Sequence, residues 1–151
     1  MNGPGPGVAD EAPGGAPEEP APAPEVLAGW AVGAPLPRFA VTVSAAANER
    51  YWRSAGVDHP LLAAGALYPP LAANLVVLTV QQADPAPLLQ TRQTLRCHRR
   101  AAAPAELVVE ATLTGRPLRR GRAYAELPAE IATADGARLW TAVATFTGIR
   151  A

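Results

Sequence analysis

The stretch 68–82, YPPLAANLVVLTVQQ, is the most apolar segment of this 151-residue chain, and it constrains how the rest must fold. Two prolines open it, and proline suits the first turn of a helix, where its missing N–H costs nothing. Apolar residues then cover most of the circumference of the helix expected over residues 71–82. A helix that is apolar nearly all round is buried in a core. The remaining elements must therefore enclose this helix.

Shorter elements are expected before this central helix. Residues 38–44 alternate between apolar and polar side chains, which predicts a short strand. Ser44 can cap a helix over residues 45–55, and Gly56 can end that helix because glycine accepts a left-handed backbone at little cost. Residues 57–67 contain proline and glycine and are expected to form a loop that leads into the central helix.

Four strands are expected after the central helix. The Asp135-Gly136 pair predicts a hairpin turn between the last two strands. The strands are residues 89–99, 106–114, 122–133 with a kink at Pro128, and 138–149. An antiparallel sheet buries a central helix on all sides only if it curls around it. The sequence thus predicts an α+β domain with a single hotdog fold, in which a curled antiparallel sheet wraps around one buried helix.

Composition divides the chain into two parts. Residues 1–26 are mostly Gly, Pro, Ala and acids, so a disordered tail is predicted there and the hotdog domain is assigned to residues 27–151. The first 25 residues hold five acids and no base, whereas the rest holds 13 arginines and 8 acids, and 13 − 8 gives +5. So mild a positive charge does not indicate nucleic-acid binding, but it suits a ligand that carries phosphates. Arginine without lysine, with abundant Ala and Pro, is typical of GC-rich bacterial coding sequences.

Several other classes of protein are disfavoured. Cys97 is the only cysteine, so no intrachain disulfide can form, and it is expected to be a small buried hydrophobe. His98 is expected to be an exposed strand residue beside arginines. No Cys/His/Asp cluster has the spacing of metal ligands, so no metal is expected. The N-terminus lacks the features of a signal peptide and the apolar helix is too short to span a membrane, so a cytoplasmic protein without membrane contact is predicted.

Residues 51–60, YWRSAGVDHP, followed by residues 67–73, LYPPLAA, resemble the active-site region of MaoC-like dehydratases and hydratases. The resemblance is strongest to the N-terminal half-domain of fatty-acid-synthase-type dehydratases. There, a helix ends in glycine, a short loop follows, and a Pro-Pro turn leads into the hotdog helix. Residues 90–100, 119–124 and 135–136 are similar to the strand pattern of this family, so the resemblance covers most of residues 39–149.

The resemblance also exposes a difference at the catalytic positions. The family's catalytic pair is an Asp after the helix-ending glycine and a His five positions further on, which add or remove water across the double bond of an acyl thioester. Aligning Gly56 and Pro60 places Val57 and Leu62 at those positions, and neither side chain can transfer a proton. Asp58 and His59 form the nearest pair that could replace them, one step out of register.

Two groups of residues are candidates for ligand binding. The resemblance implies that the thioester of acyl-CoA or acyl-phosphopantetheine lies at the start of the central helix, where backbone amides would polarise its carbonyl. The contacts expected there come from Tyr68, Pro69, Pro70, Leu71 and Asn74. Arginine binds phosphate with two hydrogen bonds, and a cluster of arginines around one turn could hold the phosphates, although a solvated hairpin explains the cluster equally well. The cluster comprises Arg116, Arg119, Arg120 and Arg122.

Three functions in acyl-thioester metabolism, of fatty-acid or polyketide type, stay open at this point. The chain could be the non-catalytic subunit of a heteromeric enoyl-thioester hydratase or dehydratase, which is a lyase. It could instead be an active (R)-specific hydratase or dehydratase that uses Asp58 and His59, or a hotdog thioesterase. It could also bind acyl thioesters without catalysis. Because a single hotdog leaves one edge of its sheet open, a homodimer or a heterodimer with a second hotdog subunit is expected. No cofactor besides the acyl-thioester ligand is expected.

Overall fold

The computed structural model describes residues 22–56 and 58–149. Within them the chain forms three helices and seven strands. Their order is β1 (Phe39–Val43), α1 (Ala45–Ser54), α2 (Pro60–Ala63), α3 (Leu71–Ala83), β2 (Leu88–Cys97), β3 (Ala105–Ala111), β4 (Leu118–Arg119), β5 (Arg122–Ala123), β6 (Ala125–Thr133) and β7 (Arg138–Gly148). In the described part of the chain, no helix is long and apolar enough to cross a membrane.

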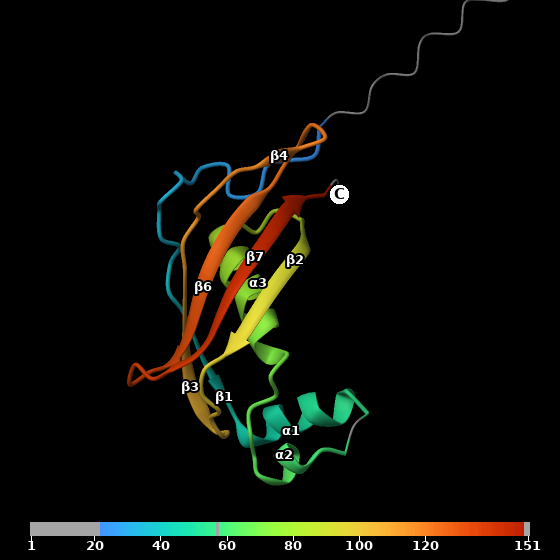
Figure 1. The fold of residues 1–151 in the computed structure, drawn as a ribbon, viewed down its shortest axis with the longest axis vertical. Coiled ribbons are helices and arrows are strands. Elements are labelled where there is room, and N and C mark those ends of the chain that lie inside the picture. Colours follow the sequence, from blue (N-terminus) through green and yellow to red (C-terminus); the bar gives the residue numbers. More distant parts are fainter. Residues whose placement is uncertain (1–21, 57, 150–151) are drawn as a thin grey trace, which may run out of the picture.

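The strands form a curved sheet that holds α3 against one face (Figure 1). Five strands lie in the order β1-β3-β6-β7-β2, and every pairing is antiparallel. The short strands β4 and β5 form a separate hairpin at one end of the sheet, whereas α1 and α2 lie at the other end (Figure 1). This arrangement is the curled antiparallel sheet around one helix that the sequence predicts.

The core lies between α3 and the inner face of the sheet. Side chains alternate along β6 and β7, so every second residue is buried against the helix. The largest fully buried side chains include Trp140, Phe146, Leu127 and Ile131. The helix contributes Leu71, Ala72, Leu75, Val76, Thr79 and Val80. The alternation over most of both strands explains why the sequence was sufficient to identify the last two long strands.

The expectation that α3 is buried all round is wrong. Asn74 and Gln81 are exposed, and the side chain of Leu78 is 44% exposed. The reason is that the sheet packs against one face of α3, whereas Asn74, Leu78 and Gln81 share the opposite face of this helix. A bulge between Gln90 and Arg92 also turns Gln90 to the same face as Gln93, which differs from the simple alternation expected for this strand.

The strand expected over residues 122–133 is divided into β5 and β6. The kink expected at Pro128 does not interrupt the strand, because Leu127, Pro128 and Ala129 keep one continuous register with β7. The β3 ladder with β6 ends beside this proline, at the pair Ala111–Ala129. Proline lacks a backbone N–H and cannot donate to a neighbouring strand. A position where the neighbouring strand β3 ends therefore tolerates proline better than a position paired on both sides.

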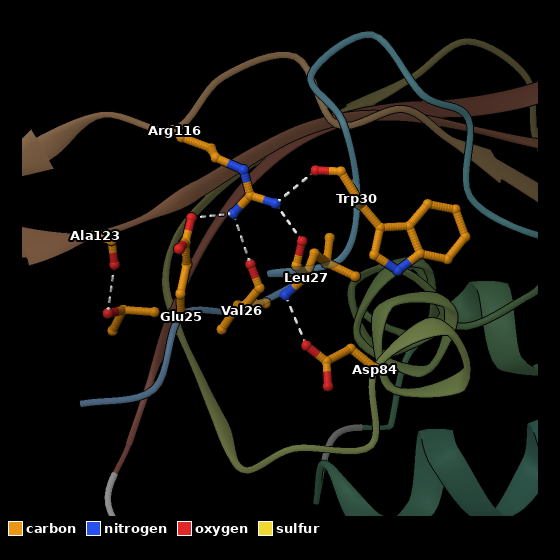
Figure 2. Close-up of polar contacts among 8 residues, drawn as sticks. Glu25, Val26, Leu27, Trp30, Asp84, Arg116 and Ala123 are labelled. Carbon is orange, nitrogen blue, oxygen red and sulfur yellow. Dashed lines mark hydrogen bonds and ion pairs between the residues drawn. The ribbon is translucent and has the colours of Figure 1, made fainter. Parts of the chain in front are cut away.

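The segment before β1 packs onto the domain through Arg116 (Figure 2). Its guanidinium forms an ion pair with Glu25 at 2.5 Å and donates hydrogen bonds to the carbonyls of Val26, Leu27 and Trp30. The Leu27 N–H in turn donates to Asp84 at 2.6 Å. Val26 and Leu27 are buried in the core. Most of the predicted tail lies outside the described residues, but the packed segment already includes Glu25 and Val26, so it begins earlier than the predicted boundary at residue 27.

Candidate functional site

The candidate site lies where α1, the loop after it and the start of α3 meet. Ser44 caps α1 by accepting the Ala47 N–H at 3.1 Å, as the sequence predicts. Beyond the helix, Gly56 has a φ of +68°, a conformation that glycine adopts without strain. This turn directs the chain into α2, which ends just before the approach to α3. The residues that resemble the MaoC-like active-site region are therefore brought together at one end of the molecule.

A polar side chain that the sequence did not single out, Asn48, joins these elements. It is 2% exposed, its amide donates to the Ala66 carbonyl at 2.8 Å, and its oxygen accepts the Tyr68 N–H at 2.9 Å. The indole of Trp52, one helical turn later, donates to the same Ala66 carbonyl at 2.8 Å. An Asn four residues before a Trp, in a short helix with a buried face, is the signal that could have indicated this hydrogen-bonded link.

His59 is held in place as part of this framework. Its Nδ1 accepts the Leu61 N–H at 3.1 Å and so caps α2. Its ring stacks on Trp52 with 5.5 Å between centroids, and Trp52 meets Tyr68 edge-on at 5.1 Å. A neutral histidine that accepts at Nδ1 carries its proton on Nε2. In this geometry the free nitrogen is a donor and has no lone pair with which to take a proton from water.

Asp58 and His59 are not hydrogen-bonded to each other in this conformation, and their role as a catalytic pair stays a prediction. Both residues are exposed, and among the described residues no hydrogen bond joins them. Asp58 borders an open hollow of about 410 Å³ together with Arg53, Gly56 and Leu62. Leu62, at the position where the family has its His, is half-buried in α2. Val57, at the position of the family's Asp, lies outside the described residues.

The start of α3 offers fewer free amides than the resemblance implies. Proline has no N–H, and the Tyr68 N–H is bound by Asn48. The next three amides, of residues 71 to 73, donate to the carbonyls of residues 68 to 70 at 3.0–3.1 Å. Pro70 is the N-cap and makes no side-chain cap. The hydrogen-bonding capacity expected to polarise a thioester carbonyl is therefore already used within the turn, and any ligand contact here falls to side chains.

The five residues expected to contact substrate differ in their exposure. Leu71 is buried in the core, whereas Pro69, Pro70 and Asn74 are exposed and Tyr68 is half-buried. Asn74 lies one helical turn before Leu78, on the exposed face of α3. Tyr68 stacks on Tyr51 of α1 with 6.2 Å between ring centroids. Three of these residues thus line the surface on which a ligand or partner could lie, and their role in binding stays a prediction.

The arginine cluster is smaller than expected. Arg116 belongs to the contact with the N-terminal segment and is not available to a ligand, which corrects its assignment to the phosphate-binding group. The other three, Arg119, Arg120 and Arg122, line a hollow of about 510 Å³ with Tyr124. Among the described residues none of the three forms an ion pair. The hairpin is at the opposite end of the sheet from α1 and α2 (Figure 1).

The expected position of Cys97 also needs correction. Cys97 is exposed, because it lies at the end of β2, on an edge strand that nothing covers. His98 is exposed as expected, and its Nε2 lies 2.8 Å from the Thr141 hydroxyl. Within residues 22–56 and 58–149, no three His, Cys, Asp or Glu side chains lie close enough together to hold a metal ion.

The sequence matches no family model and no curated protein. Solved structures do match. The (R)-hydratase from A. caviae involved in PHA biosynthesis is 22% identical, with a TM-score of 0.68, and the alignment covers 81% of this chain and 99% of that one. An R-hydratase from Pseudomonas aeruginosa is 13% identical, with a TM-score of 0.68 and coverage of 81% and 84%. The HadBC complex, a 3R-hydroxyacyl-ACP dehydratase from Mycobacterium tuberculosis, is 18% identical, with a TM-score of 0.63 and coverage of 78% and 96%.

These likenesses extend over almost the whole length of two of the three solved chains and confirm the fold predicted from the sequence. They do not distinguish the N-terminal half-domain of fatty-acid-synthase-type dehydratases from other members of the group, so that finer resemblance stays a prediction. The chain has the hotdog fold of the MaoC-like hydratases and dehydratases.

Proposed function

We propose that this chain is the non-catalytic subunit of a heteromeric enoyl-thioester hydratase or dehydratase, a hydro-lyase that acts on acyl-CoA or acyl-phosphopantetheine. One observation carries the proposal. In the loop after α1, the only histidine caps α2 through Nδ1 and stacks on Trp52, and a leucine stands where the family has its catalytic His. An acid–base step needs a group that can exchange a proton at the substrate, and this loop presents no such paired groups.

The matched structures support the class of reaction. Two are named as (R)-hydratases and one as a dehydratase complex of two components. In a complex of that kind, a hotdog that has lost its own catalytic pair can still complete the pocket of its partner. The exposed face of α3 and the open β2 edge give this chain the surface for such a contact.

The arginine hairpin is the best candidate for the ligand's phosphates. Arg119, Arg120 and Arg122 present three cations to an open hollow, and the Arg119 guanidinium lies 5.9 Å from the centre of the Tyr124 ring. Guanidinium groups bind phosphate through paired hydrogen bonds. We assign Tyr68, Pro69, Pro70 and Asn74 to the surface near the acyl part of the ligand, and Leu71 to the core that supports it.

The displaced pair Asp58/His59 is the main competing explanation. For His59 to act as a base through Nδ1, that nitrogen would have to release the Leu61 N–H. That change removes an N-cap, which costs about 0.5–2 kcal/mol. The competing function therefore requires a rearrangement, whereas the proposed function uses the loop as it stands.

Co-purification from the native host tests the proposal. The tagged full chain should bring a second hotdog subunit with it, and the complex should hydrate crotonyl-CoA. The variant Asp58→Asn/His59→Asn should leave that activity within about twofold, because asparagine preserves the helix cap. A loss of hydration in this variant with the complex intact would refute the non-catalytic role. An intact complex that binds acyl-CoA without hydrating it would refute the hydro-lyase assignment in favour of a binding module.

A further inference from the structure

The β2 strand is an unprotected edge of the sheet. It is ten residues long and hydrogen-bonded to β7 on one side only. Leu89 and Leu95 on this strand are 49% and 38% exposed. Proteins protect such edges with short strands, bulges, charged side chains or covering loops, because an open edge binds other chains. In β2 the bulge lies between Gln90 and Arg92, and the register from Arg92 to Cys97 is continuous. Residues 92–97 therefore leave a regular, unpaired edge to which another strand can hydrogen-bond.

The charge of this edge has one sign. Between Asp84 and Glu106 the chain holds no acid, whereas β2 and the residues just after it hold four arginines. Register with β7 places Arg92 and Arg96 on the outer face of the sheet, opposite Thr145 and Thr141. Neither arginine has an ion-pair partner in the described part of the chain. The inner face of the same segment carries uncharged residues, namely Gln93, Leu95 and Cys97.

These positions disfavour pairing between two copies of this chain. If a twofold axis relates two copies, their β2 strands pair antiparallel. In a sheet that continues smoothly across the pair, residues on the outer face of one β2 then lie opposite residues on the outer face of the other. A register centred on Thr94 sets Arg92 of each copy opposite Arg96 of the other. If the register is centred one or two residues away from Thr94, Arg92 or Arg96 of one copy still lies opposite or diagonal to an arginine of the other. Like charges that face each other across strands are destabilising.

We infer that β2 pairs with the edge strand of a different chain that carries Asp or Glu at the outer positions facing Arg92 and Arg96. Leu95 would then be covered on the inner side of the joined sheet. The inference deepens the proposed function, since it takes the partner to be a second hotdog subunit and assigns it an acidic edge. The arginines select against self-association, while the leucines favour association with a matched strand.

A charge-swapped copy of the chain tests this inference. The full-length variant Arg92→Glu/Arg96→Glu supplies an acidic edge on an otherwise identical surface, and sedimentation equilibrium measures each chain alone and a 1:1 mixture. Each facing pair contributes roughly 0.2–1 kcal/mol of either sign, so changing two pairs from repulsion to attraction tightens association by about fourfold to several hundredfold. The mixture should associate at least about fourfold more tightly than either chain alone. Raising the salt to about 1 M, where the Debye length is about 3 Å, should remove most of that gain.

The single variant Arg92→Glu tests the register. Around Thr94 it sets the introduced glutamate of each copy against Arg96 of the other, so this variant should associate with itself more tightly than the unmodified chain does. The control is Arg50→Glu/Arg53→Glu on α1. It changes the net charge by the same amount as Arg92→Glu/Arg96→Glu, but at a site away from β2. It should give no gain on mixing.

A mixture no tighter than the unmodified chain, or an equal gain with the control, would overturn the inference. So would a tight homodimer of the unmodified chain whose affinity is not raised by Arg92→Glu. These measurements use neither thioester nor turnover, so their outcome is independent of whether the proposed hydro-lyase activity is found.

Discussion

Replacing Asn48 by alanine should lower the free energy of unfolding by about 2–3 kcal/mol, a large share of the roughly 5–15 kcal/mol typical of a domain. The side chain makes two hydrogen bonds, one to the Ala66 carbonyl and one from the Tyr68 N–H. The loss of these two hydrogen bonds, which also leaves the Tyr68 N–H unpaired, lowers the free energy of unfolding by about 3 kcal/mol. Alanine returns about 0.6 kcal/mol through its higher helix propensity.

Urea denaturation followed by far-UV circular dichroism measures this change. Asn74→Ala is the matched control, because Asn74 is exposed on α3 and makes no hydrogen bond within the described residues. It should leave stability unchanged or raise it by a few tenths of a kcal/mol. Asn48→Asp should cost more than Asn48→Ala at neutral pH, because it buries a charge and sets an anionic oxygen against the Ala66 carbonyl. A loss below about 1 kcal/mol for Asn48→Ala, or one equal to the control, would refute the reasoning.

Three further predictions follow from particular contacts. Arg116→Ala should lower the free energy of unfolding by about 3 kcal/mol, because charged hydrogen bonds to three backbone carbonyls are lost. Arg38→Ala should lower it by under about 0.5 kcal/mol, because the ion pair of Arg38 is exposed. Denaturation of the two variants checks this contrast, and equal losses would contradict it. The hydrogen bond from Thr133 holds the pKa of Asp135 below its ordinary value, so Thr133→Val should raise that pKa. A lowered pKa stabilises the fold above the unfolded pKa, and this stabilisation is lost as the pH falls through the folded pKa; the variant should show less of it. An unchanged NMR titration of Asp135 would count against this prediction. His59→Ala should cost about 1 kcal/mol by removing a helix cap, while His59→Asn should restore most of it; equal melting of the two variants would argue against a capping role.

Local patterns were sufficient to predict the sheet and its central helix. The alternation along β6 and β7 and the apolar run in α3 identify which residues face the core, because burial on one face leaves a period in the sequence. The resemblance at residues 51–73 correctly brought the loop and the start of α3 together. The extent of burial could not be predicted in the same way, since the 44% exposure of Leu78 depends on which face of α3 the sheet packs against.

Contacts between distant residues were also beyond the sequence. Arg116 binds a segment some ninety residues away, and its side chain has no local signal that separates it from the neighbouring Arg119. Asn48 is a polar residue in a helix, where exposure is the ordinary expectation, and only the position of Ala66 explains its burial. The first amides of α3 donate to carbonyls of the same turn, and the spacing of the two prolines alone does not specify the backbone geometry that causes this.

The measurement that tests the central claim most directly is the hydration of crotonyl-CoA by this chain purified alone, beside its Asp58→Asn/His59→Asn variant. A non-catalytic subunit predicts that both proteins leave the rate at the uncatalysed background at every enzyme concentration used. Turnover that grows with the concentration of the unmodified chain, and is lost in the folded variant, would contradict the account and return Asp58 and His59 to the role of a catalytic pair.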